Sequence, residues 1–165
     1  MNVSRSLFIC ALSFALAGCS TLFKDAITPP DGASLSQTYT GTGHLQFQCA
    51  VDKHGYYWRF IAPEIEIRDA TGLLFAKQVA DFNFLATDGS SLKSKITSSQ
   101  ESSSRVRDVL FETTPRGKQN GVLSRIHWVK RTEGRGGIPD AGSCSRRTLG
   151  NFVREPFSAK FSFYR

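Results

Sequence analysis

The chain has 165 residues, a formal net charge of +7 at pH 7 and a hydrophobic content of 40%. This length suits one domain with its own core rather than several domains. The apolar run at residues 7–16 would span about 15 Å as a helix, roughly half of a bilayer core. It is therefore too short to cross a membrane as a helix, and no second long apolar run follows it.

The N-terminal segment has the pattern of a secretory signal: one positive charge at Arg5, the short apolar run and then small residues. The run ends in Leu16-Ala17-Gly18-Cys19, which resembles the bacterial lipobox, whose cysteine thiol carries diacylglycerol. We therefore expect residues 1–18 to be a lipoprotein signal peptide and Cys19 to be the lipidated first residue of the mature chain. Several acyl chains on one residue give firm membrane anchoring.

The residue after this cysteine bears on the localisation. In lipoproteins of Gram-negative bacteria an Asp at that position retains the protein at the inner membrane, whereas this chain has Ser20. Ser20 favours the outer membrane in such a bacterium, so we expect a lipid-anchored protein of the bacterial cell envelope. The alternative is an ordinary secretory signal in which Cys19 falls by chance.

The chain contains four cysteines. Cys10 leaves with the signal and Cys19 is acylated, so Cys49 and Cys144 remain in an oxidising compartment, where a disulfide between them is expected. That disulfide would close a loop of about 95 residues, which contributes about 4 kcal/mol in the chain-entropy model. Two free thiols or a metal pair are the alternatives, although the sequence has no CxxC and no histidine at a zinc-ligand spacing.

Residues 20–42 are rich in Ser, Thr, Pro, Gly and Asp. This composition predicts a flexible tether that lifts the domain off the bilayer. We therefore assign residues 19–42 to the lipidated N-terminus and tether, and residues 43–165 to the domain.

Apolar and polar residues alternate along most of this domain, and Gly/Asp turn signals separate the alternating segments. A period of two predicts strands with one buried face and one wet face. Short strands at this spacing predict an all-β domain, an antiparallel β-sandwich or a partly open barrel. The residues expected to face inward are Leu45, Phe47, Cys49, Ile65, Ile67, Phe82, Phe84, Phe157, Ala159, Phe161 and Phe163.

An ordered set of short motifs runs along the domain: Gln48-Cys49, Tyr57-Trp58-Arg59-Phe60-Ile61-Ala62-Pro63-Glu64, Asp69-Ala70-Thr71-Gly72, Ala86-Thr87-Asp88-Gly89-Ser90, Gly136-Gly137-Ile138-Pro139, Cys144 and residues 153–164. Their order and spacing resemble the family known as the domain of unknown function numbered 3455, which occurs in exported bacterial proteins and some fungal ones. They cover the chain from about Gly41 onward. The resemblance implies a strand-rich fold and a pairing of the two cysteines, but no settled activity.

The chain departs from that family pattern at two places. Gln78 stands where many members carry His before a Gly-Pro-x-Trp-Glu stretch, and Arg107-Asp108 stands where they carry Pro-Trp. A site built from that His, Trp and Glu is therefore not carried over to this chain.

No catalytic frame is evident. Gly41-Thr42-Gly43 begins a dinucleotide fingerprint, but the third glycine is missing and a strand follows it. The three histidines form no metal-binding motif, and no GxSxG elbow occurs. Glu64 and Glu66 share a strand face, which is more typical of a wet sheet surface than of a glycosidase pair. We therefore expect no enzyme, no metal and no cofactor. The alternative is an enzyme that acts on envelope polymers with polar residues from several strands in one cleft.

Five basic residues lie close together in sequence and are a candidate patch for binding a ligand or anion: Arg125, His127, Lys130, Arg131 and Arg135. Such a patch would attract an anionic glycan or a lipid head group, because each cation near anionic lipid contributes about 1 kcal/mol. An envelope protein is another possible partner besides the membrane that holds the lipid anchor. A solvated surface is the simpler interpretation, and the compartment argues against nucleic acid.

The aromatic residues Tyr56, Tyr57, Trp58 and Trp128 allow two interpretations. They line a binding cleft, or they belong to the core, which is the commoner place for strand aromatics and is favoured for Trp58. Together these features predict a non-catalytic envelope lipoprotein whose β-domain binds a ligand, glycan or protein, or serves a structural role.

Overall fold

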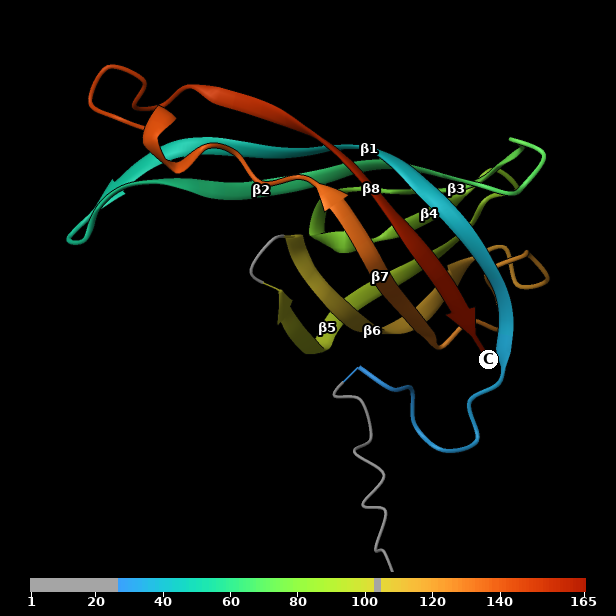
Figure 1. Cartoon of the computed structure of the whole chain (residues 1–165). Coiled ribbons are helices and arrows are strands. Elements are labelled where there is room, and N and C mark those ends of the chain that lie inside the picture. The colour runs from blue at the N-terminus through green and yellow to red at the C-terminus, as the bar shows by residue number, and fades with distance from the viewer. Residues whose placement is uncertain (1–26, 103–104) are drawn as a thin grey trace, which may run out of the picture.

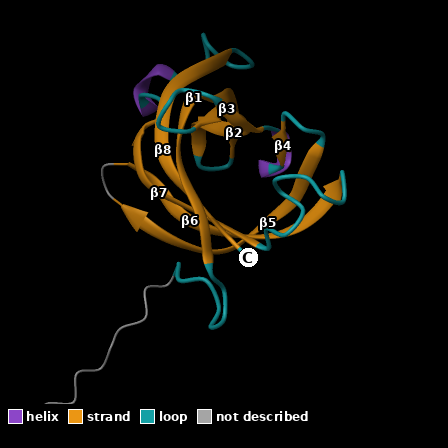
Figure 2. Cartoon of the chain, turned by 90° about the vertical axis from the view of Figure 1, so that its right-hand side faces the viewer, coloured by secondary structure: helices purple, strands orange, loops and turns teal. Residues whose placement is uncertain are grey.

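The computed structural model describes residues 27–102 and 105–165 of the chain. Within those residues eight antiparallel strands form one closed barrel, in which each strand pairs with the next and β1 pairs with β8 (Figure 2). The strands are β1 (Leu35–Asp52), β2 (Gly55–Arg68), β3 (Leu74–Gln78), β4 (Phe84–Ala86), β5 (Ser90–Ser102), β6 (Arg105–Gly117), β7 (Trp128–Gly136) and β8 (Phe152–Tyr164). Two short 3-10 turns, η1 (Ala80–Phe82) and η2 (Ala141–Ser143), complete the fold.

The predicted all-β antiparallel single domain is confirmed, and its sheet closes completely. The register of β1 with β8 runs from Leu35 opposite Tyr164 to Gln48 opposite Phe152. The predicted signal peptide at residues 1–18 and the lipidation site at Cys19 lie outside the described residues, so both stay predictions.

The domain begins earlier than the sequence indicated, because β1 starts at Leu35 and not near residue 43. The early part of β1 resembles a linker in composition, since its inner positions include Gly41 instead of a large apolar residue. A Cβ atom at Gly41 would lie 2.4 Å from Cε2 of Phe161, so the Phe161 ring fills the space that a side chain would need. The tether assignment is therefore wrong for residues 35–42.

The core is built mainly from phenylalanine rings. Phe84, Phe111, Phe161 and Phe163 are fully buried, and the Phe84 ring makes edge contacts with the other three at centroid distances of 5.9–6.2 Å. Edge-to-face pairs of this kind stabilise a core beyond the area that they bury. The predicted inward face of β8 is confirmed, whereas Phe82 lies in η1 with a positive φ of 57° and not in a strand.

One end of the barrel is closed by the connection between β6 and β7. Leu123 and Ile126 of this connection are buried in the core cluster. The Asp88 carboxylate holds the connection in place, since it accepts hydrogen bonds from the backbone N–H of Ser90 and of Val122, both at 2.9 Å. We call this end the closed end.

At the opposite end, the mouth, the β1–β2 hairpin extends beyond the other strands, and the β7–β8 connection runs beside it (Figure 1). A disulfide between Cys49 of β1 and Cys144 of that connection joins the two, which confirms the predicted pairing. Backbone hydrogen bonds reinforce the junction, from Cys49 N to Asn151 O and from Gly150 N to Cys49 O, each at 2.9 Å. The hairpin and the connection therefore act as one rigid wall above the mouth.

Candidate ligand pocket at the barrel mouth

A pocket of about 650 Å³ opens at the mouth of the barrel. Its apolar lining comes from elements that are far apart in sequence and includes Leu45, Phe47, Phe60, Phe82, Val106 and Val109. The Phe60 ring stacks on Phe82 at 5.3 Å and meets the edge of Phe47 at 5.6 Å. A concave, largely apolar volume of this size falls within the range of about 300–1,000 Å³ that is typical of small-molecule sites. We call it the mouth pocket.

Apolar side chains continue from the pocket onto its exposed rim. Tyr56, Tyr57, Ile96 and Ile138 line the pocket and are 42%, 41%, 45% and 56% exposed. Two of them are aromatic residues for which the sequence left a cleft and a core open, and the structure places both in the cleft. The rim gives an apolar ligand a continuous path from solvent to the interior.

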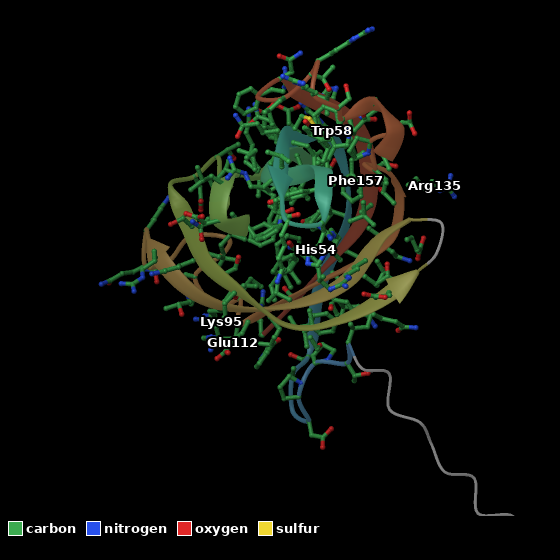
Figure 3. All side chains as sticks on the ribbon, turned by 90° about the vertical axis from the view of Figure 1, so that its left-hand side faces the viewer. His54, Trp58, Lys95, Glu112, Arg135 and Phe157 are labelled. Atoms are coloured by element: carbon green, nitrogen blue, oxygen red, sulfur yellow. A yellow bond between two sulfur atoms is a disulfide. The ribbon has the colours of Figure 1, made fainter. Side chains whose placement is uncertain are left out.

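Trp58 was expected in the core, but it is half-buried and lines the mouth pocket. Its indole Nε1 donates to the Asp140 carbonyl at 3.0 Å and to Ser143 Oγ at 3.1 Å. These bonds fix η2 against β2 close to the disulfide (Figure 3). The ring thus has a polar tip bound to the wall and an apolar face available to the pocket, as indole groups at wet interfaces commonly have. Trp128 begins β7 at the closed end and is not part of this pocket.

Arg131 is the unexpected member of the lining. Its side chain is only 5% exposed, and its guanidinium carbon lies 5.9 Å from the centroid of Phe111 and 5.4 Å from that of Phe157. Within the part of the chain that the structure describes, its one hydrogen bond runs from NH2 to the Arg107 carbonyl at 3.0 Å. The guanidinium is therefore held between two rings at the inner wall of an apolar cavity.

Burial lowers the pKa of Arg131 to about 10, and the nearby Asp108 carboxylate acts in the opposite direction. A group with this pKa remains protonated at neutral pH. Burial of a charge is costly unless a counter-charge or aromatic faces compensate for it. The mouth pocket consequently presents a buried positive charge at the inner wall of a largely apolar volume.

Arg131 does not belong to a surface patch with the other four basic residues that were grouped with it. Period-two alternation along β7 turns Val129 and Arg131 inward and Lys130 outward, and Val129 is fully buried. Arg125 and His127 are exposed near the closed end, while Arg135 points away from the barrel near the mouth (Figure 3). Arg131 therefore faces the interior, whereas the other four residues are at least partly exposed, and the alternation with Val129 was the signal that could have separated Arg131 from the rest.

A second pocket, of about 560 Å³, contains the residues that an enzymatic interpretation would need. His44, Glu64 and Glu66 all line it. Glu64 is bound to Arg154, and Glu66 is bound to Arg68 at 2.6 Å and to Lys77 at 3.0 Å. Hydrogen bonds from Arg68 and Lys77 lower the pKa of Glu66, which is the opposite of what a general acid requires.

Gln78, which departs from the resembled family, lies at the inner end of this second pocket and is fully buried. Among the described residues neither atom of its side-chain amide has a hydrogen-bond partner.

Among the residues that the structure describes, no cluster of three or more His, Cys, Asp or Glu could hold a metal ion. No helix in the described ranges is long and apolar enough to span a bilayer.

Comparisons with known proteins add no assignment: no family model, no curated protein and no solved structure matches the chain. The resemblance to the domain of unknown function numbered 3455 therefore stays a prediction from the sequence.

Proposed function

We propose that this protein is a non-catalytic lipoprotein of the bacterial cell envelope that binds a small apolar or amphipathic molecule in its mouth pocket. The lipobox at Leu16–Cys19 supports the anchor and the compartment. The mouth pocket carries the binding role, because it joins a volume of about 650 Å³ to an apolar lining and an exposed apolar rim. A barrel closed at one end and open at the other is suited to holding such a molecule out of water.

The ion pairs in the second pocket support a binding role over the enzymatic alternative. Its two carboxylates are engaged in ion pairs with Arg154, Arg68 and Lys77, and the lowered pKa of Glu66 does not suit a general acid. The mouth pocket offers apolar contact and the buried charge of Arg131, which serve recognition rather than bond cleavage.

A fluorescence titration tests the proposal. The neutral probe N-phenyl-1-naphthylamine emits strongly only in an apolar environment, and we expect it to bind the wild-type domain saturably. Ile96→Glu places a carboxylate at the rim of the mouth pocket and should weaken this binding, because the probe cannot compensate for a desolvated charge. Ile96 is 45% exposed, so the substitution leaves the core intact.

Leu85→Glu is the matched control. Leu85 is 48% exposed on β4 and does not line the mouth pocket. The Leu85→Glu variant should bind the probe as tightly as the wild type does. Equal binding by the Ile96 variant and the wild type, or no saturable binding at all, would contradict the proposal that the mouth pocket binds an apolar molecule.

A further inference from the structure

We infer that the ligand of the mouth pocket is a long-chain carboxylate, held with its carboxylate against Arg131 and its alkyl chain among the apolar side chains. This inference rests on the proposed function and adds the chemical class of the ligand. Two arginines line the pocket, and they differ in a way that identifies Arg131 as the anchor.

Arg107 stands at the rim. Its side chain is 59% exposed, and it forms an ion pair with Glu101. An exposed and paired arginine adds little to binding, because water screens it. Arg131 is 5% exposed and faces apolar surface, so an anion that reaches it meets a desolvated cation. Charge-assisted hydrogen bonds in such a place are strong, and the guanidinium fork matches the two oxygens of a carboxylate.

The charge balance favours a monoanion. One guanidinium is buried in the pocket wall, and the Asp108 carboxylate already lies close enough to act on it. Because Asp108 already offsets part of the Arg131 charge, every negative charge on a ligand adds to the excess in an apolar volume, so a head group with one charge is less costly than a head group with two. A single carboxylate on an alkyl chain satisfies both the cation and the lining, whereas an alcohol of the same length satisfies the lining alone.

Displacement of bound N-phenyl-1-naphthylamine by competing ligands measures the affinity of the mouth pocket for each head group. Hexadecanoate, hexadecanol and hexadecyl phosphate carry the same chain and differ only in the head group. The wild type should bind hexadecanoate about tenfold or more tightly than hexadecanol, as one charge-assisted hydrogen bond would provide. Arg131→Met, which keeps an unbranched side chain against the two rings, should abolish this preference while still binding the probe.

Arg107→Met makes the same change at the rim of the same pocket and should keep the preference. Arg131→Lys keeps the charge without the planar fork and should retain part of the preference for hexadecanoate, which leaves the inference testable if the Met variant does not fold.

Equal affinity of the wild type for hexadecanoate and hexadecanol would overturn the inference, as would an Arg131→Met variant that keeps the preference. Tighter binding of hexadecyl phosphate would replace the carboxylate with a phosphate head. Failure of the neutral probe to bind would instead count against the proposed function.

Discussion

Cys49 on β1 is bonded to Cys144 in the β7–β8 connection, across 95 residues of sequence. The bond ties the connection to the β1–β2 hairpin, and these two segments carry Trp58 and Ile138 of the mouth pocket. The disulfide thus contributes to the shape of the pocket as well as to the stability of the barrel.

Removal of this disulfide should destabilise the mature protein by about 4 kcal/mol, because the unfolded chain regains the freedom of a long loop. Urea unfolding with and without a reductant measures the difference. Intact-mass analysis should show both cysteines unreactive toward an alkylating agent until reduction. An unfolding midpoint that reductant leaves unchanged would contradict the structural role of the bond.

Two phenylalanines of β8 should respond very differently to replacement by alanine. Phe161 is fully buried against Phe84, so Phe161→Ala should cost about 3–5 kcal/mol of unfolding free energy. Phe152 is 56% exposed on the same strand, and its replacement should change stability by no more than about 0.5 kcal/mol. Chemical denaturation of the two variants checks this, and similar losses would show that the strand register is wrong.

The alternation that identified the inner face of β8 was predictable, because phenylalanines at every second or fourth position leave one possible buried face. The paired cysteines were predictable from the expected compartment. The start of β1 was not predictable, because a strand rich in glycine and threonine has the composition of a linker. Gly41 is required there because the Phe161 ring occupies the space that a side chain would need. The mouth pocket was not predictable either, because its lining residues meet only when the barrel closes.

The position of Arg131 could not be predicted from its charge. In sequence it stands among other cations, and its partner positions, Val109 on β6 and Phe161 on β8, place it on the inner wall. A buried cation is expensive, so the default expectation for a run of basic residues is a solvated surface. The structure reverses that expectation at one position out of five.

Asp88 should give the protein an acid-sensitive contribution to stability. Hydrogen bonds, first from the Ser90 hydroxyl and then from the backbone N–H groups of Ser90 and Val122, lower its pKa from 3.8 to about 2. A carboxyl whose pKa is lower in the folded state stabilises the fold above its unfolded pKa and loses this effect as pH falls through the folded value. Stability from this group is therefore complete above pH 3.8 and declines toward about pH 2.

Asp88→Asn tests that assignment. The variant should be less stable than the wild type at neutral pH, because the carboxylate that holds the β6–β7 connection is gone. Its loss of stability between pH 3.8 and about 2 should also be smaller than that of the wild type. Parallel pH profiles of the urea midpoint for the two proteins would rule out this role for Asp88.

The lipid anchor is tested by replacement of its single acceptor. Cys19→Ala should abolish incorporation of labelled palmitate and leave the protein without its membrane attachment, since the thiol that carries diacylglycerol is missing. Cys10→Ala, within the predicted signal, is the control and should be lipidated normally. Continued labelling of the Cys19 variant would refute the lipobox.

The central claim is that a long-chain carboxylate enters the mouth pocket, and the two tryptophans of the chain locate it directly. Trp58 lines the pocket, whereas Trp128 stands at the closed end. Hexadecanoate is titrated into Trp128→Phe, which reports only from Trp58, and into Trp58→Phe, which reports only from Trp128. A saturable change of emission in the first variant and none in the second is the predicted result. A change confined to the variant that reports from Trp128, or no change in either, would contradict binding at the mouth.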